Sequence, residues 1–126
     1  MNDLKRSDDE LALVELAAKV LPAGGFGNLS FDIVIKAGRG GRVWDVSGNE
    51  YVDYLLGSGP MLIGHGNEEV LAAIQEQLPR GTTFFANNEA GIRLAAEIVD
   101  AVACADKVRY VSSGGEANLY AMRLAR

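Results

Sequence analysis

Residues 108–118 read VRYVSSGGEAN, a short β-prone run followed at once by two serines, two glycines and a glutamate. Downstream, residues of one face recur at helical spacing: Ala117, Tyr120, Ala121 and Leu124. The pattern predicts a strand, a tight turn and a helix. A helix start exposes N–H groups at the positive end of its dipole, and glycine lets a ligand approach the backbone. Ser113, Gly114 and Gly115 are therefore candidates to hold a phosphate. A plain turn that uses glycine for its geometry is the equally good alternative.

The segments before this turn alternate between predicted helices and strands. Helical spacing behind a capping residue predicts three helices, at residues 7–19, 67–78 and 88–103. The β-prone runs lie at residues 33–35, 42–46 and 51–54. The turn sequence at residues 47–50, Ser-Gly-Asn-Glu, predicts that the last two runs form a hairpin. Residues 55–66 are a glycine-rich loop whose spacing does not match a dinucleotide-binding motif.

The composition excludes several classes of protein. The chain has 126 residues, a formal net charge of −5 and one cysteine. An acidic chain lacks the basic face of a general nucleic-acid binder, and no apolar run approaches the ~20 residues that span a bilayer. Cys104 cannot form an internal disulfide and is expected to be buried. The charged N-terminus has no apolar signal core, so we expect a cytoplasmic protein. His65 lacks metal-ligand partners in its motif, so we predict a hydrogen-bonding role and no metal site.

Several stretches, taken together, resemble a known family. They are residues 44–54 (WDVSGNEYVDY), 59–65 (GPMLIGH), 108–118 and 123–126 (RLAR). In this order and at this spacing they resemble the class III, pyridoxal-phosphate-dependent aminotransferases. Within that class the chain is most similar to the glutamate-1-semialdehyde 2,1-aminomutase subfamily.

The resemblance implies an α/β protein of the fold-type I class of pyridoxal-phosphate-dependent transferases. Residues 1–66 would supply an N-terminal helix and a β-hairpin segment of the small domain, and residues 67–126 the start of the large cofactor-binding domain. The implied enzyme is a homodimer that moves the amino group of a small amino-acid or amino-ketone substrate. The family's Schiff-base lysine and the carboxylate that partners the pyridine nitrogen would lie beyond Arg126. Residues 1–126 alone are therefore expected to be inactive, and no catalytic residue is assigned among them.

The resemblance also implies roles for individual residues. Ser113, Gly114 and Gly115 would bind the phosphate of pyridoxal 5'-phosphate, and Ser30 and Ser58 would line the substrate site. Gly115 stands where the family usually has threonine, so one hydroxyl is lost while the backbone N–H remains. Two alternatives stay open: an ordinary class III aminotransferase that uses another amino donor, and a non-catalytic phosphate-binding module.

Overall fold

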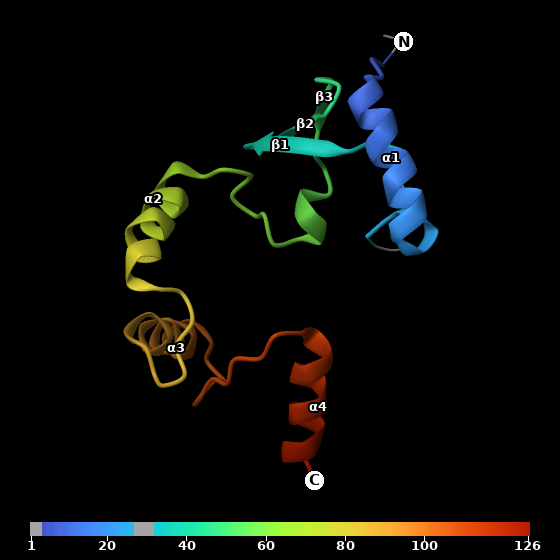
Figure 1. Ribbon diagram of the computed structural model, residues 1–126. Helices are drawn as coiled ribbons and strands as arrows, with labels where there is room; N and C mark the ends of the chain where they lie inside the picture. The colour runs from blue at the N-terminus through green and yellow to red at the C-terminus, as the bar shows by residue number, and fades with distance from the viewer. Residues whose placement is uncertain (1–3, 27–31) are drawn as a thin grey trace. The chain divides into compact units, whose positions relative to one another are not determined.

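The computed structural model describes residues 4–26 and 32–126 (Figure 1). The chain divides into two units, one that ends at Arg80 and one that spans Gly81–Arg126, and each is described by itself. The expected boundary after residue 66, between segments of a small and a large domain, stays a prediction.

The first unit begins with helix α1, Asp8–Val20. Ser7 is its N-cap, and the Ser7 hydroxyl accepts a hydrogen bond from the N–H of Glu10 at 3.2 Å. This bond satisfies one of the donors that a first turn leaves without a partner. Three acidic residues also occupy the first turn, where the helix dipole favours negative charge. The helix predicted over residues 7–19 is therefore confirmed.

A three-stranded antiparallel sheet follows, with strand order β1-β2-β3. Its strands are β1 Ile35–Arg39, β2 Arg42–Asp45 and β3 Glu50–Val52. The predicted hairpin is confirmed, because Trp44 pairs with Glu50 across β2 and β3. The prediction for the first strand, residues 33–35, is wrong in its bounds. The strand begins at Ile35 and runs on to Arg39, because β2 provides pairing partners along that stretch.

Buried polar groups connect α1 to the hairpin. The fully buried carboxylate of Glu10 accepts hydrogen bonds from the Ser47 hydroxyl and from a backbone N–H ahead of β1. Asp45 is 3% exposed, and its carboxylate accepts bonds from the Asn49 N–H and the Tyr51 hydroxyl, both at 2.7 Å. Burial raises the pKa of Asp45. The hydrogen bond from the Asn49 side-chain amide, together with those from the Tyr51 hydroxyl and the Asn49 N–H, outweighs this effect and holds the pKa below its ordinary value of 3.8.

The other three α-helices of the described residues also begin at capping side chains. They are α2 Glu68–Gln77 behind Asn67, α3 Glu89–Ala101 behind Asn88, and α4 Gly114–Leu124 behind Ser113. The helices expected from the sequence in these places are confirmed. Residues 108–111, expected to be a strand, are not one. A strand requires a hydrogen-bonded neighbour, and no segment of the described chain pairs with these residues.

Within residues 4–26 and 32–126 no apolar side chain is buried, and Glu10 and Asp45 are the only buried residues. The stripes predicted to face a core remain open, with Ile74 48% and Ile92 59% exposed. Cys104, expected to be buried, is exposed as well. The composition would allow a core, but nothing in the described part of the chain covers these faces. In that same part, no helix is both long and apolar enough to cross a membrane.

Candidate functional site

Helix α4 begins at the serine–glycine turn. Ser113 has an extended backbone, with φ −151° and ψ 157°, and its hydroxyl accepts a hydrogen bond from the Glu116 N–H at 3.3 Å. Gly114 and Gly115 are the first two residues of the helix. No hydrogen bond within the described residues uses their N–H groups. The turn therefore presents two backbone donors at the positive end of the helix dipole.

Neither glycine of this turn is required by the structure around it. A Cβ placed on Gly114 would meet no atom within 4 Å, and one on Gly115 would lie 3.9 Å from the Ser113 hydroxyl. Neither residue has a positive φ, and alanine is the better residue inside a helix. The interpretation of these glycines as a requirement of turn geometry finds no support here. Instead, the open backbone leaves room for a group that approaches it closely.

Glu116 places a negative charge at the same helix end. Its carboxylate accepts a hydrogen bond from the Ser112 N–H at 2.8 Å and one from the Ser113 hydroxyl at 3.3 Å. These contacts form a local cap of the capping-box kind. A bound phosphate would thus be held mainly by the N–H groups of Gly114 and Gly115, and the Ser113 hydroxyl would have to exchange its bond to Glu116. The residues present fit a phosphate through these backbone donors.

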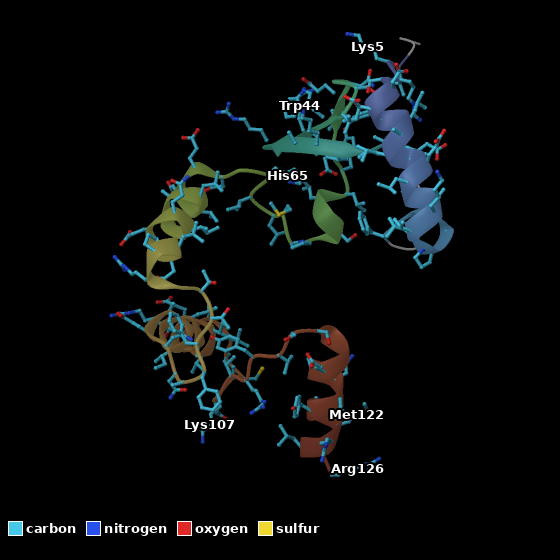
Figure 2. The ribbon with its side chains drawn as sticks, in the orientation of Figure 1. Lys5, Trp44, His65, Lys107, Met122 and Arg126 are labelled. Carbon is cyan, nitrogen blue, oxygen red and sulfur yellow. The ribbon has the colours of Figure 1, made fainter. Side chains whose placement is uncertain are left out.

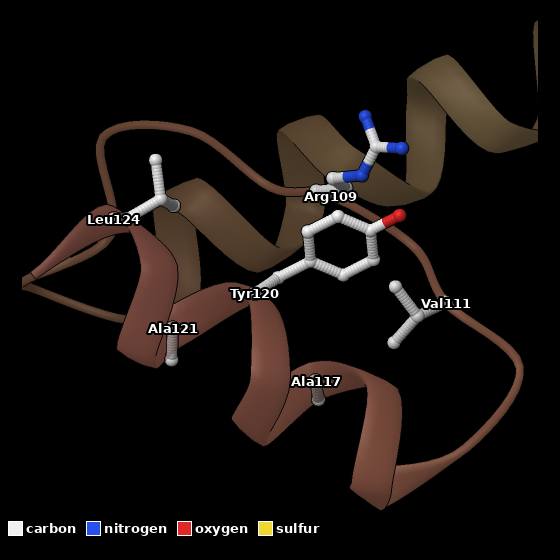
Figure 3. A pocket seen from close by; sticks show the side chains of 6 residues that line it. All are labelled: Arg109, Val111, Ala117, Tyr120, Ala121 and Leu124. Atoms are coloured by element: carbon white, nitrogen blue, oxygen red, sulfur yellow. The ribbon is translucent and has the colours of Figure 1, made fainter.

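An open cavity of about 430 Å³ lies along α4 in the second unit (Figure 3). It is lined by Arg109, Val111, Ala117, Tyr120, Ala121 and Leu124. Four of these residues are the helical stripe predicted from the sequence, so that prediction is confirmed. The Arg109 guanidinium stands over the Tyr120 ring, 4.9 Å from its centroid, in a cation–π contact. The rest of the lining is largely apolar, which suits packing against another structural element.

Ser58 lies in the first unit, at the end of the short 3-10 helix Leu56–Ser58 in the loop between β3 and α2. Figure 1 shows this loop in green. The backbone is left-handed at four successive residues, with φ 47° at Leu56, 66° at Gly57, 64° at Ser58 and 118° at Gly59. Ser58 is exposed, and its hydroxyl makes no hydrogen bond within the described residues. The loop thus holds a serine in a strained conformation that glycine adopts more readily.

Asp53 and His65 lie at the two ends of this loop and contact each other. Figure 2 labels His65. His65 Nε2 lies 2.7 Å from Oδ2 of Asp53, and Oδ1 of Asp53 accepts hydrogen bonds from the N–H groups of Leu55 and Leu56, both at 2.9 Å. The bond to His65, with help from the backbone N–H groups, holds the pKa of Asp53 below its ordinary value of 3.8. The predicted hydrogen-bonding role of His65 is confirmed.

The predicted site residues divide between the two units. Ser113, Gly114 and Gly115 share one turn of the second unit, whereas Ser58 belongs to the first. Ser30 lies outside the described residues. Sequence reasoning missed Asp53. Its signal was an aspartate at the start of a loop, where the carboxylate commonly bonds the backbone two residues on.

Comparison with known proteins agrees with the motifs. The model of the family described as Aminotransferase class-III matches residues 25–126. The glutamate-1-semialdehyde 2,1-aminomutase of Persephonella marina is 48% identical over 94 residues, which cover 75% of this chain and 22% of that protein. The glutamate-1-semialdehyde 2,1-aminomutase of Clostridium novyi is 38% identical over 133 residues, covering 100% of this chain and 30% of that protein.

Solved structures agree as well. An omega-transaminase from Sphaerobacter thermophilus matches with a TM-score of 0.86 and 28% identity, over 97% of this chain and 29% of that one. A transaminase with PLP bound matches with the same TM-score and identity, over 98% of this chain and 30% of that one. The expected fold-type I class is confirmed. The chain spans 22% to 30% of the length of these curated relatives. It belongs to the class III aminotransferase family.

Proposed function

We propose that the complete protein containing these residues is a pyridoxal-phosphate-dependent enzyme that moves an amino group on a small amino-acid or amino-ketone substrate. The matched relatives named above are glutamate-1-semialdehyde 2,1-aminomutases, which favours transfer within one molecule. The observation that carries the proposal is the pair of uncovered N–H groups at Gly114 and Gly115, on glycines that the local structure does not need. A homodimer and a cytoplasmic location stay predictions.

In this proposal the described residues bind and orient the cofactor. Gly114 and Gly115 donate backbone N–H groups to its phosphate, and the Ser113 hydroxyl joins them when it leaves Glu116. Pyridoxal phosphate, once bound, supplies an electron sink for bonds at the amino-bearing carbon. Ser30 and Ser58 are proposed to contact the substrate. The lysine that the chemistry needs is not assigned to this chain, so residues 1–126 alone are expected to be inactive.

An ordinary aminotransferase is the second candidate. The two solved structures described above are transaminases by their titles, and they match the fold as a whole. The two candidates differ in what they consume. A mutase turns over repeatedly on a single substrate, whereas an aminotransferase stops after one half-reaction unless an amino acceptor is added. A non-catalytic phosphate-binding module is disfavoured, because the described residues bury no apolar side chain that could stabilise an independent module.

Cofactor retention by the complete protein tests the proposal. Gly114→Leu would place a large side chain over the N–H groups, and we expect most of the bound pyridoxal phosphate to be lost on dialysis, measured by its absorbance. Gly41→Leu is the matched control, because Gly41 also faces open space without a positive φ but lies between strands of the sheet. Full retention in Gly114→Leu, with the control also loaded, would show that the phosphate is held elsewhere.

A further inference from the structure

The loop over residues 53–65 is tied to the sheet at its far end. The N–H of His65 donates to the carbonyl of Gly40 at 2.9 Å, and the carbonyl of His65 accepts from the N–H of Gly40 at 2.8 Å. A Cβ on Gly38 would lie 2.7 Å from Cγ of His65, so the imidazole rests directly on β1. The contacts to Gly40 and Gly38 therefore fix the backbone and the ring of His65 independently of its contact with Asp53.

Asp53 connects His65, whose position is fixed, to the backbone at the start of the loop. One carboxylate oxygen faces His65 at 2.7 Å, and the other accepts hydrogen bonds from the N–H groups of Leu55 and Leu56. Asp53 is only 14% exposed, so its bonds are largely shielded from water. Since both oxygens are occupied, the orientation of the carboxylate determines where the backbone of Leu56 begins its turn.

The turn that starts at Leu56 is costly to maintain. Leu56 and Ser58 are not glycines, yet both have a positive φ. Such residues persist where surrounding contacts hold them, and they concentrate at functional sites. The carbonyl of Leu56 accepts hydrogen bonds from the N–H groups of Gly59 and Met61, which closes the turn from its other side. The Asp53 carboxylate and these two bonds together fix the conformation of Leu56.

Within the described residues, the strained backbone at Ser58 does not bring its side chain to a hydrogen-bond partner. Its hydroxyl is exposed and makes no hydrogen bond there. Glycine would relieve the strain at this position, so the side chain is the one thing that serine adds. A hydroxyl held rigidly, in the open, by a strained turn is suited to a ligand.

We propose that Asp53 and His65 are positioning residues that fix the turn at Leu56–Ser58 and so present the Ser58 hydroxyl to the amino substrate. This inference rests on the proposed function, in which Ser58 contacts the substrate. Neither residue of the pair needs to touch the substrate. Their effect passes through the backbone of Leu55 and Leu56.

The complete enzyme tests the pair by steady-state kinetics. We expect Asp53→Asn and His65→Ala to raise KM for the amino substrate about tenfold, which is the usual effect of losing a charged hydrogen bond. The kcat and the pyridoxal phosphate content should change little. His65→Gln retains a donor that can reach Asp53 and should restore much of the affinity. Hydrogen exchange at the Leu55 and Leu56 amides should speed up in Asp53→Asn and remain slow in His65→Gln.

A double-mutant cycle separates positioning from loss of stability. If the pair acts through Ser58, Ser58→Ala should raise KM to a similar extent, and Asp53→Asn added to it should raise KM little further. Asp45→Asn, in the β2–β3 hairpin that precedes Asp53, is the structural control, and it should leave exchange at Leu55 and Leu56 slow. Glu76→Gln, which removes an exposed ion pair with Arg80, should leave both readouts unchanged.

The outcomes distinguish this inference from the function beneath it. Wild-type complete protein with no amino-transfer activity would overturn both. Active wild-type enzyme whose KM is unchanged in Asp53→Asn would overturn the positioning role alone. Fully additive effects of Asp53→Asn and Ser58→Ala would overturn it too, because the pair would then act independently of Ser58.

Discussion

Glycine serves opposite purposes in two of the regions where this chain concentrates it. Between β1 and the end of the loop at His65, a Cβ added at two of the glycines would collide with protein: at 2.7 Å from the His65 ring for Gly38 and 2.9 Å from the Gly40 backbone for Gly64. At the start of α4, a Cβ on Gly114 would meet nothing within 4 Å. Gly38 and Gly64 are needed so that two segments of the chain can approach each other closely. Gly114 leaves space that the described residues do not fill.

The contrast between Gly64 and Gly114 gives a structural criterion that separates glycines required by the fold from glycines that bind a ligand. A glycine with a positive φ or a blocked Cβ is explained by the fold. A glycine with neither, placed where alanine would stabilise a helix, requires another explanation. By this criterion Gly64 belongs to the fold, and Gly114 and Gly115 belong to whatever approaches the helix end.

The largest effect is expected for Gly64→Ala. Its φ is +83°, and the new Cβ would press on the backbone of Gly40, which has no flexible side chain that could yield. Strain and overpacking together should cost about 3 kcal/mol of local stability. Hydrogen exchange of the paired Gly40 and His65 amides in the complete protein measures this cost.

Gly41→Ala is the control for that substitution. Its Cβ would meet nothing within 4 Å and its φ is not positive, so we expect a change within about 0.5 kcal/mol. Equal effects of Gly64→Ala and Gly41→Ala on exchange would contradict the conclusion that the close approach to Gly40 requires glycine at position 64.

A smaller effect is expected for Gly38→Ala, because the obstacle is a side chain. The new Cβ would displace the His65 ring, and the ring would lose its bond to Asp53. We expect Gly38→Ala to reduce local stability by about 2 kcal/mol. In a His65→Ala background the clash disappears, so adding Gly38→Ala should then cost little. A cost that is the same in both backgrounds would mean that the imidazole does not fill the space above Gly38.

The first region should also respond to acid. Both carboxylates with a lowered pKa, Asp45 and Asp53, lie in it. A carboxylate whose pKa falls on folding stabilises the folded state above its unfolded pKa and loses that contribution as the pH drops through the lower folded value. Exchange protection of the hairpin should therefore decline as the pH falls below about 3.8. In Asp45→Asn, exchange protection should decline less steeply with falling pH. An unchanged pH profile in that variant would show that Asp45 does not cause the decline.

Much of this arrangement follows from local sequence, and the rest depends on contacts across the chain. Ser7, Asn67 and Asn88 each act as the cap that the sequence predicts, because capping needs only the next three residues. Ser113, predicted only as a phosphate ligand, caps α4 in the same way. The strand expected at residues 108–111 is absent, because pairing depends on a neighbouring segment. The role of Asp53 was missed for a related reason, since its partner His65 lies twelve residues away and on the far side of a loop.

The smallest change in stability, and the sharpest test of the second region, is expected for Gly115→Thr. The side chain would enter open space near the Ser113 hydroxyl, so the stability of the complete protein should stay within about 0.5 kcal/mol of wild type. If Gly115 faces the phosphate, the added hydroxyl supplies one more donor. Pyridoxal phosphate should then dissociate about fivefold more slowly, as one net hydrogen bond allows. Gly41→Thr, whose side chain would also enter open space but lies between β1 and β2, should leave the release rate unchanged. Faster or unchanged release in Gly115→Thr would contradict the assignment of Gly115 to the phosphate, because the extra donor would then face away from it.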